Sequence, residues 1–347
     1  MLTRPSSQPT VLNLRVGELV EVRSEPEILA TLDENGELES LPFMPEMLQF
    51  CGQQFRVGKL ALKLCDTINW TGIYRMQHAV HLQGVRCDGQ AHGGCQAGCL
   101  VYWKEAWLKR VETNEPEPGR AGAEPLDTPA APQQEQLPRC TRIELIDRAH
   151  NHGVADSAGE ERFSCQATEL IRAAPDRIPS WDPRQYVLDV RSGNATTIAT
   201  IRSVCVGLFN EFQDLSRKVL PERLRLWGGK RFPFIEGKLK RTPEASLGLE
   251  PGELVRVKSK EAIVQTLDVH NRNRGMSFDA EMLKYCGREA RVLRRVERII
   301  DERSGKMIRF KNPCIILEDV ICTSDYHRLC PRSIYPYWRE IWLERVE

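Results

Sequence analysis

The chain of 347 residues contains no run of about 18 uncharged apolar residues, the length that spans a lipid bilayer. Its first residues, MLTRPSSQPT, lack the apolar segment of a secretory signal. Charge of one sign is not in excess either, because 49 Lys and Arg and 48 Asp and Glu leave a net charge of +1. We therefore expect a cytoplasmic protein that binds no membrane and exerts no global field on nucleic acid.

The sequence motifs of common nucleotide and hydrolytic sites are missing as well. There is no Walker phosphate loop, no dinucleotide-binding glycine fingerprint, no nucleophile elbow and no HExxH helix. The sequence therefore assigns no catalytic residue, and it leaves open whether the protein is an enzyme. A protein partner or a small-molecule substrate remains the expected ligand, without further identification.

Cysteine, in contrast, is frequent, with 12 residues. Without an export signal these thiols are expected to stay reduced, and clustered cysteine and histidine then indicate metal binding or catalysis more often than disulfides. Isolated cysteines are a different case, because a free thiol often packs as a small apolar group. We expect Cys65 and Cys205 to be of this second kind, and Cys314 as well unless it serves as a ligand.

Residues Gly17–Glu112 align with Gly252–Glu347 without an insertion or deletion. The shared landmarks keep their order and spacing: Gly-Glu-Leu-Val (17–20 and 252–255), Thr-Leu-Asp (31–33 and 266–268), Glu-Met-Leu (46–48 and 281–283), Cys-Gly (51–52 and 286–287) and Trp-x-Glu-x-Trp-Leu (103–108 and 338–343). Two units are too few for a solenoid, so the pattern predicts the duplication of one compact domain. We call the two units the first and second copy.

Four parts are expected: a first metal-binding domain (1–112), a flexible linker (113–138), a mixed helical middle domain (139–245) and a second metal-binding domain (246–347). The linker is predicted from its six prolines and its lack of aromatic residues. Short Val- and Leu-rich segments within each copy predict strands. The expected fold is therefore α+β, with two small SH3-like barrels flanking the middle domain.

The clearest element of the middle domain is a helix over residues 196–219. Its apolar residues fall on one helical stripe, which predicts that the helix packs a core: Ile198, Ile201, Val204, Cys205, Leu208, Phe209, Phe212 and Leu215. A second helix is predicted around 166–173 and a strand around 185–190.

Each copy carries the spacing Cys-x4-His-x2-Cys, at Cys87, His92 and Cys95 and again at Cys322, His327 and Cys330. Zinc prefers four thiolate or imidazole ligands in a tetrahedron, and a tight loop can supply several of them. The recurrence of three ligand-type residues at fixed spacing therefore predicts two zinc sites. An iron site or an iron–sulfur cluster is the alternative, because thiolates and imidazole also ligate iron.

The fourth ligand of each site is open between two models. In the local model, Cys99 completes the first site, and the second site is incomplete or uses Cys314, since Ile334 replaces Cys99 there. In the shared model, slightly favoured because Cys51 and Cys286 recur with the motif, these two cysteines complete the sites. A separate loose set, Cys140, His150, His152 and Cys165, is more typical of ordinary loop residues and a buried cysteine.

The Trp-x-Glu-x-Trp-Leu segments alternate with the period of a strand, which favours tryptophans in a core over a platform for flat ligands. Residues 288–311 are rich in arginine and lysine, but Glu289, Glu297, Asp301 and Glu302 are interleaved with them. This pattern predicts a salt-bridged hairpin, and nucleic acid is the least favoured partner.

The segments 86–99, 102–108 and Cys165–Leu170 resemble segments of bacterial proteins that share the signature RCDGxAHGGCQAGC and YWKEAWL and have no established activity. The resemblance suggests a common domain arrangement and a link to polysaccharide or natural-product biosynthesis. Two functions are consistent with it. The first is a binding or accessory module with structural zinc, and the alternative is a metalloenzyme or iron–sulfur enzyme of such a pathway.

Overall fold

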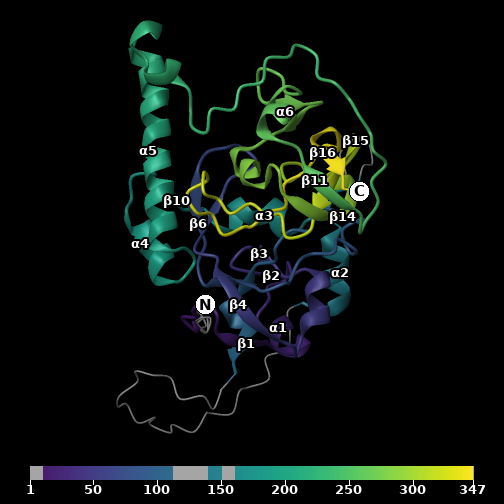
Figure 1. The fold of residues 1–347 in the computed structure, drawn as a ribbon. Coiled ribbons are helices and arrows are strands. Elements are labelled where there is room, and N and C mark those ends of the chain that lie inside the picture. Colours follow the sequence, from purple (N-terminus) through teal and green to yellow (C-terminus); the bar gives the residue numbers. More distant parts are fainter. Residues whose placement is uncertain (1–10, 112–139, 151–160, 347) are drawn as a thin grey trace.

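The computed structural model describes residues 11–111, 140–150 and 161–346 (Figure 1). It is a mixed α+β structure with several antiparallel sheets, as the sequence predicts. The linker predicted at 113–138 lies outside the described residues.

The first copy forms a five-stranded sheet in the order β8-β7-β4-β1-β9. Its strands are β1 (Leu19–Val22), β4 (Gln54–Leu60), β7 (Ala79–Leu82), β8 (Trp103–Lys104) and β9 (Leu108–Arg110). Around it lie helix α1 (Glu25–Leu29), the strands β2 (Glu37–Leu38), β3 (Leu41–Pro42), β5 (Lys63–Cys65) and β6 (Ile73–Arg75), and the 3-10 helices Pro45–Phe50 and Glu105–Trp107.

The second copy forms a four-stranded sheet in the order β15-β14-β11-β16. Its elements are β11 (Leu254–Val257), α6 (Lys260–Val264), β12 (Arg272–Asn273), β13 (Met276–Ser277), β14 (Glu289–Ile300), β15 (Met307–Leu317), β16 (Leu343–Arg345) and the 3-10 helices Ala280–Tyr285 and Glu340–Trp342. The strand registers of the copies correspond, since Leu19 pairs with Arg56 and Leu254 with Arg291. The hairpin predicted over 288–311 is formed by β14 and β15.

The first part of the middle region packs on the first copy. Helices α2 (Arg142–Ala149) and α3 (Gln166–Ala173) contribute Leu145 and Leu170 to the core of that copy. Strand β10 (Arg177–Ile178) pairs with β6. Residues 140–150 and 161–178 therefore belong structurally to the first copy.

The strand predicted at 185–190 is wrong, because these residues lie in helix α4 (Arg184–Arg191). Val, Leu and Tyr in this segment suggested a strand. The buried residues, however, are Gln185 and Asp189, four positions apart, which is the spacing of one helix face. Asp189 pairs with the buried Lys63 of β5 at 2.5 Å, so a tertiary contact decides the conformation.

Helix α5 (Thr197–Val219) forms as predicted and begins at Thr196, whose hydroxyl accepts a hydrogen bond from the Ala199 N–H at 3.2 Å. Its predicted role in a core is wrong, because most of the apolar stripe is exposed and polar residues face the protein. Periodicity shows that a helix has an apolar face, but not which face the rest of the chain covers. The 3-10 helices Glu222–Leu224 and Leu226–Gly229 follow α5.

The tryptophans of the two Trp-x-Glu-x-Trp-Leu segments, Trp103, Trp107, Trp338 and Trp342, are fully buried in two separate cores. In the first copy, the Trp107 indole N–H donates to the Thr31 hydroxyl at 3.1 Å. The prediction that these residues fill cores is confirmed. Within the described residues, no helix combines the length and apolar character needed to cross a membrane.

Candidate metal centre

The loop with the first Cys/His motif folds back on itself between Cys87 and Cys99. The Cys87 N–H donates to the Cys99 carbonyl at 2.9 Å, and the Gly94 N–H donates to the Gly89 carbonyl at 2.9 Å. Gly89 has a φ of +72°, and a Cβ added there would lie 2.0 Å from the Cys95 carbonyl oxygen. The turn therefore requires glycine, and it brings Cys95 close to the start of the loop.

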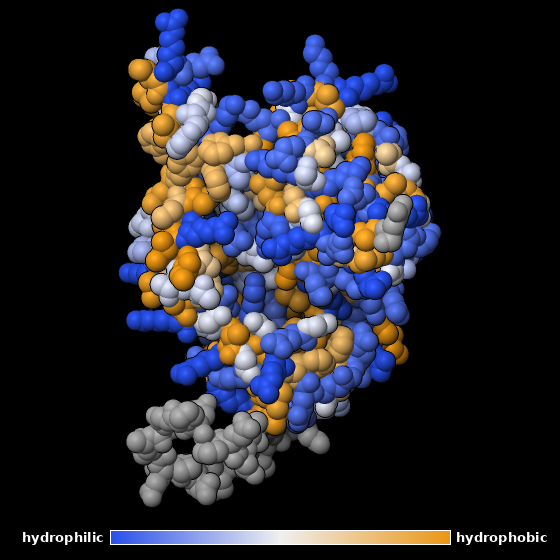
Figure 2. All heavy atoms as spheres, in the orientation of Figure 1, coloured by the Kyte–Doolittle hydropathy of each residue, from blue (hydrophilic) through white to orange (hydrophobic). Residues whose placement is uncertain are grey.

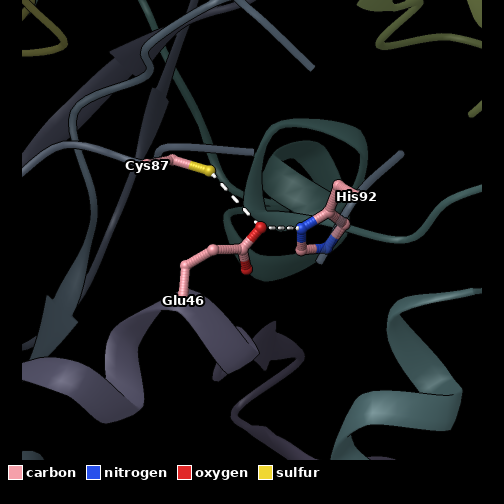
Figure 3. A group of neighbouring side chains, drawn as sticks. All are labelled: Glu46, Cys87 and His92. Atoms are coloured by element: carbon pink, nitrogen blue, oxygen red, sulfur yellow. Dashed lines mark hydrogen bonds and ion pairs between the residues drawn. The ribbon is translucent and has the colours of Figure 1, made fainter. Parts of the chain in front are cut away.

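Glu46, from the 3-10 helix Pro45–Phe50, holds this loop in place (Figure 3). Its Oε1 lies 2.6 Å from His92 Nδ1, accepts a hydrogen bond from the Ala91 N–H at 3.1 Å and lies 3.9 Å from Cys87 Sγ. One ligand atom from each of Glu46, Cys87 and His92 lies within 4.8 Å of the others. These three side chains therefore form a candidate site for a single metal ion.

Both ring nitrogens of His92 already face an acceptor. Nε2 lies 3.0 Å from the carbonyl oxygen of Ser164, and Nδ1 faces the Glu46 carboxylate. A carbonyl oxygen only accepts hydrogen bonds, so the Ser164 contact uses Nε2 as a donor, and the Glu46 carboxylate occupies the position that faces Nδ1. In this arrangement His92 anchors the loop to Glu46 and to the segment before α3. To bind an ion, it would have to give up one of these hydrogen bonds.

A cavity of about 540 Å³ lies against the loop, between the two copies. Its walls come from the first copy, from the start of α3 and from the second copy. The polar residues and cysteines that line it are Thr67, Cys87, His92, Cys95, Cys99, Tyr102, Cys165, Gln166, Asp301, Glu302, Arg303, Arg332, Tyr335 and Tyr337. Four cysteines therefore line one cavity, three from the motif loop and one from the N-terminus of α3.

Gln166 places the fourth cysteine, Cys165, in this wall. The buried Gln166 side chain accepts a hydrogen bond from the Tyr102 N–H at 2.8 Å and donates to the carbonyls of Tyr102 at 2.9 Å and Pro42 at 3.0 Å. Cys165 itself is the N-cap of α3, and its N–H donates to the Thr168 hydroxyl at 3.0 Å. The start of α3 is thus tied to the first copy beside the motif loop.

The four thiols are spread around the cavity. Among the described residues, no three of these sulfurs lie within 4.8 Å of one another. Burial raises the pKa of Cys99 and of Cys165 to about 12, and it also raises the pKa of Cys87. Cys95 Sγ accepts a hydrogen bond from the Ile300 N–H of the second copy at 3.4 Å. An ion that binds these groups as thiolates must therefore displace their protons.

Tyr102, which lines the cavity, has an unsatisfied hydroxyl. The hydroxyl is buried and has no hydrogen-bond partner in the described part of the chain. Burial raises the pKa of Tyr102 well above its usual value, so the group is neutral. A buried hydroxyl without a partner costs about 1–3 kcal/mol, which favours a polar occupant beside it.

The second copy closes the cavity through contacts with the motif loop. The Gln96 N–H donates to the Arg298 carbonyl at 3.1 Å, and the Gln96 side-chain oxygen accepts from the Arg298 N–H at 3.1 Å. The Arg86 guanidinium stacks 4.0 Å from the Tyr335 ring centroid and donates to the Ser333 carbonyl at 2.9 Å. The cavity is thus an interface between the copies, and its shape depends on their docking.

The second Cys/His motif has a different geometry. His327 Nε2 lies 3.1 Å from the Asp279 carboxylate, and Cys330 Sγ accepts the N–H of Cys65 from the first copy at 3.2 Å. Among the described residues, Cys322, His327 and Cys330 do not bring three ligand atoms within 4.8 Å of one another. Burial tends to raise the pKa of Cys330, but hydrogen bonds from Cys65 and Arg332 outweigh it and lower this pKa.

The remaining predicted ligands lie elsewhere. Cys51 and Cys286 pack at the edges of the two cores, and Cys314 lies in a small apolar cluster with Val296 and Ile316. None of the three is among the described residues that line the cavity. The structure thus gathers Cys87, His92, Cys95 and Cys99 at one site, and it places Cys322, His327 and Cys330 in a second region without Cys286.

Sequence reasoning did not assign three residues that matter here: Glu46, Cys65 and Cys165. Glu46 recurs as Glu281, whose Oε1 accepts the Tyr326 N–H at 2.6 Å, so the repeated Glu-Met-Leu landmark carried a signal. Cys165 had a weaker signal, since it was one of a loose set of possible ligands with Cys140, His150 and His152. Cys65 had none, because the second copy has Ile300 at the corresponding position.

Comparison with known proteins adds no assignment to this geometry. The chain matches no family model, and no curated protein or solved structure is detectably similar to it.

Proposed function

We propose that this chain is an iron–sulfur protein that holds a polynuclear cluster in the cavity through Cys87, Cys95, Cys99 and Cys165. The observation that carries the proposal is the convergence of four cysteines on one cavity of about 540 Å³. Four thiolates are the usual ligand set of a [2Fe–2S] or [4Fe–4S] cluster. The cluster would supply electron transfer or a redox-active centre to a biosynthetic reaction.

The spacing of the sulfurs favours a cluster over a single ion at these four residues. Zinc binds thiolates at about 2.3 Å in a tetrahedron, which places the sulfurs about 3.8 Å apart. No three of these sulfurs among the described residues lie even within 4.8 Å of one another. A cluster tolerates wider spacing, because several iron and sulfide ions lie between the thiolates.

Two neighbouring groups would support such a centre. The Ile300 N–H, which donates to Cys95 Sγ at 3.4 Å, would stabilise negative charge on a ligand sulfur. The unpaired Tyr102 hydroxyl would donate to a sulfide or a thiolate inside the cavity. His92 and Glu46 would keep the loop in register without being ligands.

A single zinc ion bound by Glu46, Cys87 and His92 is the second candidate. Its support is that each of the three residues places one ligand atom within 4.8 Å of the ligand atoms of the other two. Zinc there would be structural, consistent with an accessory module in which SH3-like barrels flank the middle region. This model requires a fourth ligand, and it requires His92 Nδ1 to exchange its hydrogen bond with Glu46 for the ion.

Anaerobic purification followed by absorption spectroscopy, iron analysis and acid-labile sulfide analysis distinguishes the two candidates. The full-length chain should show absorption above about 400 nm and contain iron and sulfide in equal amounts. Cys99→Ser and Cys165→Ser should lose most of this absorption. Cys140→Ser is the matched control, because Cys140 is a buried cysteine outside the cavity lining, and it should keep the absorption.

A colourless protein with one equivalent of zinc that is lost in His92→Ala and kept in Cys165→Ser would refute the cluster and support the second candidate. Retained iron and sulfide in Cys165→Ser with loss in Cys51→Ser would refute the proposed ligand set. Purified protein that holds neither metal after reconstitution with iron and sulfide or with zinc would refute both proposals.

A further inference from the structure

Helix α5 exposes a regular apolar seam on the outer edge of the molecule (Figures 1 and 2). The exposed positions follow one another at steps of three and four residues: Ile198, Ile201, Cys205, Leu208, Phe212, Leu215 and Val219. Apart from Cys205, the residues of this series have exposed fractions from 49% for Phe212 to 80% for Ile198. Alternating steps of three and four are the a and d positions of a heptad repeat.

Away from the seam, α5 contacts the segment that follows it through polar groups and through Phe209, whose ring centroid lies 5.6 Å from that of Trp227 and 6.3 Å from that of Phe234. Its buried residues include Asn210 and Gln213. Asn210 exchanges two hydrogen bonds with the backbone of Phe232, at 2.7 and 3.1 Å, and the Gln213 amide donates to the Leu226 carbonyl at 3.1 Å. These hydrogen bonds join α5 to residues 226–232, which follow it in the chain. The apolar seam therefore faces outward because side-chain hydrogen bonds tie the other face to the chain.

An exposed seam of this kind is costly for an isolated molecule. Scattered apolar residues are common on protein surfaces, but a continuous row over about 32 Å of helix is not. A heptad seam is complementary to another helix with the same period, since each side chain packs into a gap between side chains of the partner. In this chain α5 itself has that period, so a second copy offers a matching surface.

The area is sufficient for a stable pair. If each of the seven seam residues buries about 100 Å², the two helices together bury roughly 1,400 Å². This total area is within the range of about 1,200–2,000 Å² for specific interfaces. Most homodimers have two-fold symmetry, in which the same patch of each subunit meets its copy. A helix with a seam along most of its length satisfies this requirement.

We propose that the protein forms a homodimer in which the apolar seam of α5 packs against α5 of a second copy. The pair is a two-helix contact on the edge of the molecule, away from the cavity. It does not depend on any metal, so its test is independent of the iron–sulfur proposal.

Sedimentation velocity and light scattering of the full-length chain test the proposal. The unmodified chain should be a dimer. Leu208→Asp and Phe212→Asp should each raise the dimer dissociation constant at least about tenfold, because each change places a charge in the seam twice per dimer. Val269→Asp is the matched control: Val269 is 65% exposed and lies outside α5, so this variant should remain a dimer.

Loss of fold does not confuse this test, because Leu208 is 63% exposed and its replacement leaves the core intact. Unchanged circular dichroism and unchanged tryptophan fluorescence would verify this. A chain that stays monomeric up to about 100 µM would refute the homodimer. The seam would then be a binding site for a helix of another protein. A dimer that persists in both α5 variants would refute the role of the seam.

Discussion

Glu340 in the second Trp-x-Glu-x-Trp-Leu segment is expected to stabilise the second copy by accepting hydrogen bonds from backbone N–H groups. Its buried carboxylate accepts hydrogen bonds from the Ser246 hydroxyl at 2.7 Å, from the N–H groups of Leu247 and Gly248, and from Arg295. Burial alone would raise the pKa of Glu340, but these hydrogen bonds outweigh it and lower this pKa below the usual 4.5. The charged form is therefore stabilised in the folded state.

Glu340→Gln should lower the free energy of unfolding by about 2 kcal/mol at pH 7, because hydrogen bonds to a charged group contribute about 1.5–3 kcal/mol and the amide places its NH₂ group against a donor. A carboxylate whose pKa is lowered by folding contributes stability above its unfolded pKa of 4.5. This contribution is lost as the pH falls through the lower folded pKa. The difference between the two proteins should therefore be constant from pH 6 to 8 and shrink below pH 4.5.

Urea denaturation followed by tryptophan fluorescence at pH 7 and at pH 3.5 measures both quantities. Glu344→Gln is the matched control, since the Glu344 side chain is 47% exposed and its nearest cation, Arg256, lies 3.7 Å away. This control should change the free energy of unfolding by less than about 0.5 kcal/mol. A Glu340→Gln variant as stable as the unmodified chain at pH 7, or one whose deficit grows in acid, would refute the reasoning.

Three further substitutions test the site and its support. Gly89→Ala should destabilise the motif loop by more than about 2 kcal/mol in thermal unfolding, because the backbone has a positive φ and the new Cβ meets the Cys95 carbonyl; an unchanged midpoint would contradict this. Gln166→Leu should reduce the bound metal measured by elemental analysis, since three buried hydrogen bonds beside Cys165 are lost; full metal content would argue against this positioning role. Lys63→Ala should cost about 3–5 kcal/mol in urea denaturation, because it leaves the Asp189 carboxylate buried without its cation, and a loss below about 1 kcal/mol would count against the pair.

Local sequence signals predicted many of the elements. The helix predicted around 166–173 is α3, and the helix predicted over 196–219 is α5. Strong periodicity and capping residues act within a few positions, so a sequence window contains the information. The segment 185–190 failed for the opposite reason, since the buried contact between Asp189 and Lys63 joins residues far apart in the chain.

The candidate site was predictable only in its local part. The spacing of Cys87, His92 and Cys95 placed three chemically reactive residues in one glycine-rich loop, and the structure sets that loop in a cavity wall with Cys99. Cys165 joins it through Gln166, and Cys65 approaches Cys330 across the two copies. These pairings depend on how separate elements dock, which no spacing within the sequence records.

By itself, the sequence determined the α+β class, the apolar faces of the helices and the reactive loop, because each follows from neighbours within a few residues or within one turn. Only the tertiary structure decided which face of α5 is buried, which cysteines share a cavity and which group His92 contacts. Those outcomes depend on long-range packing and on the pairing of buried polar groups. A buried polar group stabilises the fold only when a residue far away in the sequence supplies its hydrogen-bond partner.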